Sequence, residues 1–119
     1  HGQANAEVMG GIQISGQGGL VDFVRGAKAA KGGRSILALA STAASGRISR
    51  IVPRLAAGTP VTVTRADVDL VVTEHGVADL RFANLGERAQ RLIAIADPRH
   101  RDELEKEWCE IQRHPGREI

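Results

Sequence analysis

A glycine-rich segment, SGQGG at residues 15–19, stands directly before an apolar pattern with helical spacing. Glycine lets the backbone approach a ligand closely and turn its N–H groups toward it. The start of a helix adds partial positive charge, so the segment suits an anion or an oxyanion. It lacks the Gly-Lys-Ser/Thr ending of a phosphate-binding loop and the third glycine of a dinucleotide fingerprint. Taken alone, it favours a plain turn over a ligand cradle.

A second candidate is the tetrapeptide TEHG, residues 73–76, which follows the apolar run DLVV. Ligands of α/β sheets bind at the carboxyl ends of strands, where a carboxylate positions a substrate, a water or another catalytic group. Glu74 is the residue placed to do this. The simpler interpretation, which the tetrapeptide alone favours, is that Glu74 caps the next turn and that His75 is a loop residue.

A third candidate is the pair Ser41-Thr42, which follows the apolar run SILALA and precedes SGRISR, residues 45–50. Small hydroxyl residues at the end of a strand bind polar ligand groups, and Arg47 and Arg50 are suited to phosphates. A polar surface loop is the favoured alternative. The sequence has neither a nucleophile elbow nor metal-ligand spacing.

Composition excludes several classes of protein. The formal net charge of +2 is spread along the chain, and only 3% of the residues are aromatic, so neither a basic stripe nor a stacking surface for nucleic acid is predicted. No apolar run reaches the roughly 20 residues that cross a bilayer, and we see no signal peptide. The single cysteine, Cys109, indicates a reducing compartment, here the cytoplasm. Because the chain begins at His1, we expect it to be part of a longer protein.

Apolar spacing predicts three helices. The first begins at Leu20 and ends at the Gly32-Gly33 pair. The second runs from Leu85 to Ala96, with Asn84 as its cap and Glu87 returning the bond. The third begins at Pro98 after the cap residue Asp97, buries Leu104, Trp108 and Ile111, and turns Glu103, Glu105 and Glu107 to solvent.

Strands are predicted between these helices. The runs 35–40 and 69–73 are typical of buried strands, 61–64 alternates like a half-buried strand, and a short strand is expected at 12–14. A loop is expected over 41–49 and a helical turn over 77–80. Helices that alternate with short apolar strands predict an α/β layer architecture.

Together these segments resemble a known family. In chain order, they are GQANAE, SGQGGLVDFVRGA, KGGRSILAL-ST, SRIVP, VTRADVDLVVTEHGVADLR and RAQRLIAIADPRHRDEL. In this order they resemble the C-terminal domain of the acetyl-CoA hydrolase/transferase family. The resemblance implies that residues 1–119 form such a domain. It also implies an open, layered α/β sheet with flanking helices, shared by CoA-transferases and some sugar-phosphate isomerases.

The resemblance implies that the full protein moves CoA between short-chain carboxylic acids of the acetate, butyrate or 4-hydroxybutyrate type. The route is ping-pong through a glutamyl-CoA thioester. Gly18 and Gly19 then contact CoA or the reacting carbonyl, and Glu74 is an active-site neighbour of the nucleophile. A lysine of related enzymes is replaced near Ala44, where Arg47 is the candidate substitute. The nucleophilic glutamate lies upstream, so the 119 residues alone are expected to be inactive.

The resemblance also sets expectations for ligands and partners. Coenzyme A arrives as a thioester substrate, and neither a permanent cofactor nor a metal is expected. Partners are acyl-CoA, small carboxylates and the N-terminal part of the same protein, with a homo-oligomer left open and no nucleic acid or membrane. The alternatives are an acetyl-CoA hydrolase and a non-catalytic CoA-binding module.

Overall fold

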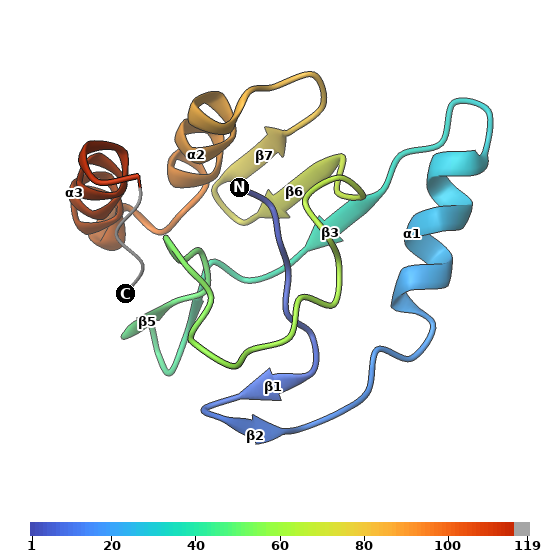
Figure 1. The fold of residues 1–119 in the computed structure, drawn as a ribbon, viewed down its shortest axis with the longest axis horizontal. Coiled ribbons are helices and arrows are strands. Elements are labelled where there is room, and N and C mark those ends of the chain that lie inside the picture. Colours follow the sequence, from blue (N-terminus) through green and yellow to red (C-terminus); the bar gives the residue numbers. More distant parts are fainter. Residues whose placement is uncertain (116–119) are drawn as a thin grey trace.

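A three-stranded mixed sheet lies at the centre of the chain (Figure 1). The computed structural model describes residues 1–115. The central strand β6 (Leu70–Thr73) pairs in parallel with β3 (Ile36–Ala38) and antiparallel with β7 (Gly76–Asp79). The carboxyl ends of β3 and β6 therefore lie side by side, and the segments that follow them are brought together.

Two short hairpins flank the sheet. The first consists of β1 (Val8–Met9) and β2 (Ile12–Gln13), and the second of β4 (Thr42–Ala43) and β5 (Ile48–Ser49). The second hairpin follows β3 closely, so its turn projects from the same end of the sheet as the β6–β7 turn.

The three predicted helices are confirmed. They are α1 (Leu20–Ala29), α2 (Leu85–Ala94) and α3 (Pro98–Arg113). The reciprocal cap between Asn84 and Glu87 begins α2, and the Asp97 side chain accepts from the Arg99 amide at the start of α3. None of the helices among residues 1–115 is long and apolar enough to cross a membrane.

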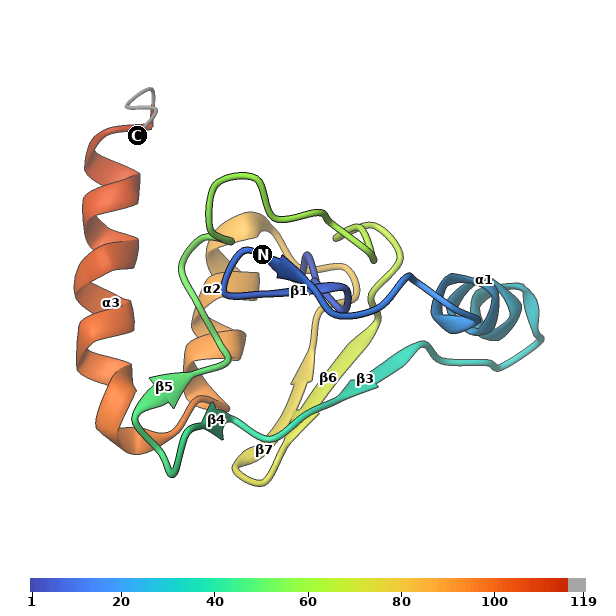
Figure 2. The same cartoon turned by 90° about the horizontal axis from the view of Figure 1, so that it is seen from below.

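The core lies between one face of the sheet and the helices. Leu80 is fully buried there, and Val71 and Ala78 are 5% and 1% exposed. Val24 of α1 and Leu92 of α2 pack into the same cluster. A second cluster joins Ile93, Ala96 and Leu104, which attaches α3 to α2. Figure 2 shows α2, α3 and the N-terminal segment on one side of the sheet.

Three local predictions are wrong. Residues 77–79 belong to strand β7, and Leu80 directly follows it, so no helical turn forms there. Gly76 adopts a φ of 141° that lets the chain reverse after His75. Residues 61–64 form no strand; only Val63 bridges to Ala4. The expected loop at 41–49 contains the β4–β5 hairpin.

The prediction of a buried strand at 35–40 is half right. A strand forms at Ile36–Ala38, but Ile36 is 56% exposed and Ala38 is exposed as well. By contrast, β6 alternates between half-buried and buried residues. One face of the sheet therefore has no covering layer among residues 1–115.

Candidate functional site

The side chain of Glu74 is held against Ser41 where two neighbouring strands end. Ser41 follows β3 and Glu74 follows β6. The Ser41 hydroxyl donates to Oε1 of Glu74 at 2.6 Å, and the Ser41 backbone N–H donates to Oε2 at 2.9 Å. Ser41 is fully buried, whereas the Glu74 side chain is 49% exposed. The sequence singled out both residues, and the structure shows that they form one clamp.

This clamp keeps Glu74 ionised. The Ser41 hydroxyl, then the Ser41 amide and the amide of Glu74 itself, lower the pKa of the Glu74 carboxyl from its ordinary 4.5 to about 2. At neutral pH the group is therefore an anion that accepts hydrogen bonds. It can fix the loop after β3 and shape the local charge, but it has no proton to donate.

The clamp should respond to acid in one direction. Because the pKa of Glu74 is depressed in the folded chain, the clamp contributes stability above pH 4.5 and loses it as the pH falls toward about 2. We expect Glu74→Gln to flatten the pH dependence of unfolding between these values. Chemical denaturation at several pH values measures this, with exposed Glu105→Gln as the control. An unchanged slope in Glu74→Gln would contradict the clamp.

A chain of polar groups continues from Glu74 toward α3. His75 Nε2 lies 3.7 Å from Glu74 Oε1 and 4.0 Å from Asp97 Oδ2. Asp97 also pairs with Arg99 at 2.8 Å, and the Arg99 hydrogen bonds hold the pKa of Asp97 well below its usual range. Sequence reasoning gave Asp97 only a capping role, and His75 none. The sequence signal that could have pointed to His75 and Asp97 is that TEHG, residues 73–76, and ADP, residues 96–98, each stand at the end of an apolar run.

The start of α3 also holds the turn between β4 and β5. His100 Nε2 lies 2.9 Å from the carbonyl oxygen of Gly46. A Cβ on Gly46 would collide with Nη2 of Arg99, and the φ of Gly46 is +87°. Gly46 therefore allows the close approach of Arg99, and α3 fixes the hairpin that carries Arg47.

Arg47 is exposed and borders a shallow hollow of about 300 Å³ between the β5 segment and α3. Ala44, where the family resemblance expects a lysine in related enzymes, has a φ of +50° in the preceding turn. The hollow has room for part of a ligand, and Arg47 supplies a cation at its rim.

The glycine loop lies apart from the Glu74 clamp. Gly18 has a φ of +54°, and Gly19 is the cap residue of α1 with no side-chain cap bond. Both glycines are exposed. Figures 1 and 2 place α1 beyond β3, away from the β6–β7 turn. Within residues 1–115, Gly18 and Gly19 therefore lie apart from the pair Glu74 and Ser41, and Arg47 lies separately on the turn between β4 and β5.

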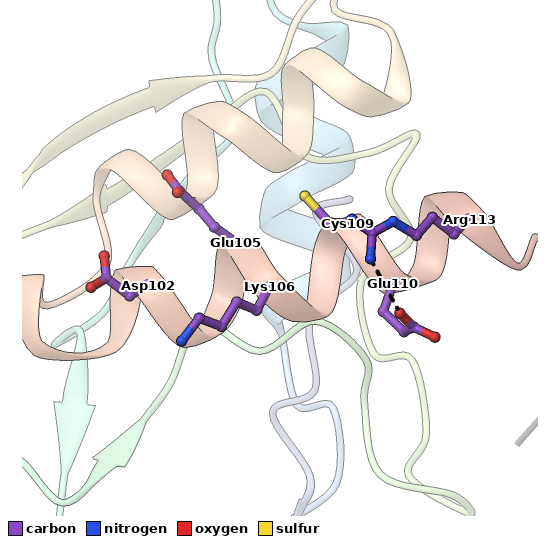
Figure 3. A pocket seen from close by; sticks show the side chains of 6 residues that line it. All are labelled: Asp102, Glu105, Lys106, Cys109, Glu110 and Arg113. Atoms are coloured by element: carbon purple, nitrogen blue, oxygen red, sulfur yellow. Dashed lines mark ion pairs between the residues drawn. The ribbon is translucent and has the colours of Figure 1, made fainter.

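Another hollow runs along the outside of α3 and has a volume of about 480 Å³ (Figure 3). Its lining side chains all come from α3, and an ion pair joins Glu110 and Arg113. None of the predicted site residues borders it. Within the described part of the chain, no three His, Cys, Asp or Glu side chains are grouped to hold a metal ion. The candidate site is therefore the Glu74 clamp with the neighbouring hairpin.

Comparison with known protein families shows which family the chain belongs to. Residues 1–108 match the model of the acetyl-CoA hydrolase/transferase C-terminal domain. The chain belongs to this family. It is 51% identical over 107 residues to 4-hydroxybutyrate coenzyme A transferase of Clostridium kluyveri. That match covers 90% of the chain and 25% of the relative, so the chain spans about a quarter of that relative's length.

Solved structures of the family share the fold. RipA from Yersinia pestis is 49% identical, with a TM-score of 0.84 over 93% of this chain and 25% of its own. The 4-hydroxybutyrate CoA-transferase from Porphyromonas gingivalis is 53% identical, with a TM-score of 0.67 over 81% of this chain and 22% of its own. The α/β fold of a CoA-transferase domain is thereby confirmed.

Proposed function

We propose that the chain is the C-terminal part of a longer CoA-transferase that moves CoA between short-chain carboxylic acids. The observation that carries the proposal is the Ser41–Glu74 clamp. It fixes a carboxylate at the carboxyl ends of β3 and β6 in a chain half identical to a named CoA transferase. That end of an α/β sheet is where ligands bind.

The proposed chemistry divides between this chain and the rest of the enzyme. A glutamate carboxylate outside the 119 residues attacks the thioester carbonyl, and the CoA thiolate leaves as a mixed anhydride forms. The thiolate then attacks the glutamyl carbonyl, releases the first acid and leaves a glutamyl-CoA thioester. The acceptor carboxylate reverses the sequence and departs as the new acyl-CoA.

Each tetrahedral intermediate carries an oxyanion that needs preorganised N–H donors. In this proposal the backbone of Gly18 and Gly19 lies against CoA or the reacting carbonyl. Arg47, at the rim of its hollow, meets the phosphates of CoA. Glu74 stands beside the nucleophile and, through Ser41, fixes the loop that borders the acyl group. It cannot serve as the proton donor, because it is ionised at neutral pH.

Hydrolysis is a second candidate, and one relative favours it. An acetyl-CoA hydrolase of Yarrowia lipolytica is 39% identical over 102 residues, which cover 82% of this chain and 18% of that protein. The two activities differ only in whether water or a carboxylate reaches the glutamyl thioester. A non-catalytic CoA-binding module is the third interpretation, and it predicts saturable CoA binding without turnover.

The test of function uses the full-length protein with butyryl-CoA and isotopically labelled acetate. Transfer predicts labelled acetyl-CoA with no net loss of thioester. Free thiol that accumulates without labelled acetyl-CoA would assign hydrolysis instead. Binding of CoA with neither product would leave the non-catalytic module and overturn the enzyme proposal.

The role of the glycine loop in catalysis can be tested by a substitution that adds one methyl group. A Cβ on Gly19 would lie 3.4 Å from the Phe23 ring, an ordinary contact, so the fold should tolerate alanine there. If the backbone of Gly19 faces the substrate, Gly19→Ala should lower kcat about 10-fold or more while unfolding stays near wild type. Gly16→Ala, in the same loop and in open space, is the control. Equal rates in both variants would remove Gly19 from the site.

CoA thioesters act as substrates, and no permanently bound cofactor takes part. The proposed partners are acyl-CoA, small carboxylates and the rest of the same polypeptide. The proposal does not specify whether the enzyme forms a homo-oligomer. The exposed free thiol of Cys109 suits a reducing compartment, so we expect the enzyme in the cytoplasm.

A further inference from the structure

The two faces of the central sheet are unequal. Side chains alternate along a strand, so the pairing register decides which residues share a face. Ile36 pairs with Leu70, and Val72 pairs with Ala38 on one side and Val77 on the other. One face, here called the outer face, therefore consists of Ile36, Ala38, Leu70, Val72, Val77 and Asp79.

The outer face is apolar and bare. Ile36 is 56% exposed and Val77 is 61% exposed, while Leu70 and Val72 are half-buried. On the opposite face, Val71 and Ala78 are buried in the core. Figure 2 shows that α2, α3 and the N-terminal segment lie on that opposite side. Five of the six outer-face residues are hydrophobic, and only Asp79, which pairs with Arg81 at 2.6 Å, is polar.

Such a face is unusual for this type of sheet. Sheets with parallel strands are normally covered by helices on both faces, which is why their strands are continuous hydrophobic runs. The runs SILALA and DLVVT have that composition. The composition of β3 and β6 therefore matches a sheet that is covered on both faces. Residues 1–115 cover only one of these faces.

The total surface area agrees with a missing layer. The chain exposes 7745 Å². A compact monomer of 12.7 kDa exposes about 6,200 Å². The excess of about 1,500 Å² is at the upper end of the range for interfaces between domains of one chain. The radius of gyration, 14.4 Å, also exceeds the roughly 13.5 Å of a compact domain of this length.

We propose that an amphipathic α-helix from the rest of the same polypeptide docks on the outer face. This inference rests on the proposed function, in which the chain is one part of a longer enzyme. The relative from Clostridium kluyveri is about four times as long as the matched segment, so ample chain exists to supply the layer. A segment of the same polypeptide has a high effective concentration, which favours it over a second copy. The helix packs apolar residues on Ile36, Val72 and Val77 and places a polar residue near Asp79.

Coverage is tested by cysteine labelling in the full-length enzyme on a Cys109→Ser background. Ile36→Cys and Val77→Cys should react with maleimide at least about 100-fold more slowly in the native than in the denatured enzyme. Glu105→Cys, on the solvent side of α3, should react at nearly its denatured rate. Native rates near the denatured rates at positions 36 and 77 would overturn the proposal. If either cysteine variant fails to fold, Ile36→Ala and Val77→Ala decide: a clear loss of Tm supports coverage, and an unchanged Tm contradicts it.

The occupant is identified by a benzophenone amino acid at position 36 of the same enzyme. Irradiation should give adducts of monomer mass that map to a helical segment outside the 119 residues. Adducts of dimer mass would assign the face to a second copy and overturn the proposal, as would adducts within the 119 residues. The transfer assay on wild-type enzyme is scored separately. Absent transfer with a covered face would sink the proposed function alone, and transfer with a bare face would sink this inference alone.

Discussion

The 119-residue chain, purified alone and mixed with acetyl-CoA and a short-chain carboxylate, is expected to transfer no CoA. Its carboxylate at the site, Glu74, is engaged by both the hydroxyl and the amide of Ser41. Its depressed pKa, about 2, makes the carboxylate a weak nucleophile. The glycine loop, which is expected to contact the reacting carbonyl, lies apart from Glu74 beyond β3 (Figure 1). The nucleophile of the proposed mechanism is a glutamate outside these 119 residues, so a thioester bound to the chain alone would meet no free attacking carboxylate.

A thioester assay of the purified chain beside the full-length enzyme measures this directly. Circular dichroism should first establish that the chain is folded, so that inactivity is not mistaken for unfolding. Robust turnover that disappears in Glu74→Ala would contradict the expectation and would make Glu74 the nucleophile.

The second large effect is expected from Glu74 in the full-length enzyme. Glu74→Ala removes the acceptor for both Ser41 donors and releases the loop after β3. A shift of about 1 Å at a reacting centre costs on the order of 10²-fold in rate, so we expect kcat to fall by about that factor. The covalent CoA adduct should still form, more slowly, because the attacking carboxylate lies elsewhere. Steady-state kinetics and intact-mass measurement give the two readings.

Ser41→Ala is the matched control for this effect. It removes the 2.6 Å hydroxyl bond but keeps the backbone bond at 2.9 Å, so its loss of kcat should be smaller than that of Glu74→Ala. Equal losses would mean that the hydroxyl alone carries the function of the clamp. Wild-type kcat in Glu74→Ala would remove Glu74 from the active site.

Local sequence signals predicted the helices well. The Asn84 and Asp97 caps form through contacts between residues two or three apart, so the sequence alone contains the whole interaction. The β6–β7 reversal was missed because the pattern around 77–80 resembles a helical turn. What decides it is the pairing of Thr73 with Gly76 and the positive φ of Gly76.

The candidate site could be predicted only in part. Glu74 and Ser41 were each singled out from the ends of apolar runs, but their direct contact depends on the parallel pairing of β3 with β6. The link from His75 through Asp97 to Arg99 joins two elements more than 20 residues apart and has no local signal. The separation of Gly19 from Glu74 was not predictable either, because spacing along the chain does not give the position of α1.

The mismatch between the predicted burial of β3 and its exposed side has another cause, which is not the absence of a local sequence signal. SILALA has the composition of a strand buried on two faces, and the structure covers one of them. The strand forms, but its predicted burial fails for residues 1–115 because the composition of β3 fits a sheet with a second covering layer. We attribute that layer to the rest of the enzyme, so this mismatch is itself informative about the longer protein.

The position of the covalent intermediate can be mapped directly in the full-length enzyme. The full-length enzyme is incubated with acyl-CoA and no acceptor, digested, and searched by mass spectrometry for the glutamyl-CoA thioester. We expect a single modified glutamate outside these 119 residues. A thioester on Glu74 would overturn the proposed mechanism, because the residue held by Ser41 would then be the nucleophile.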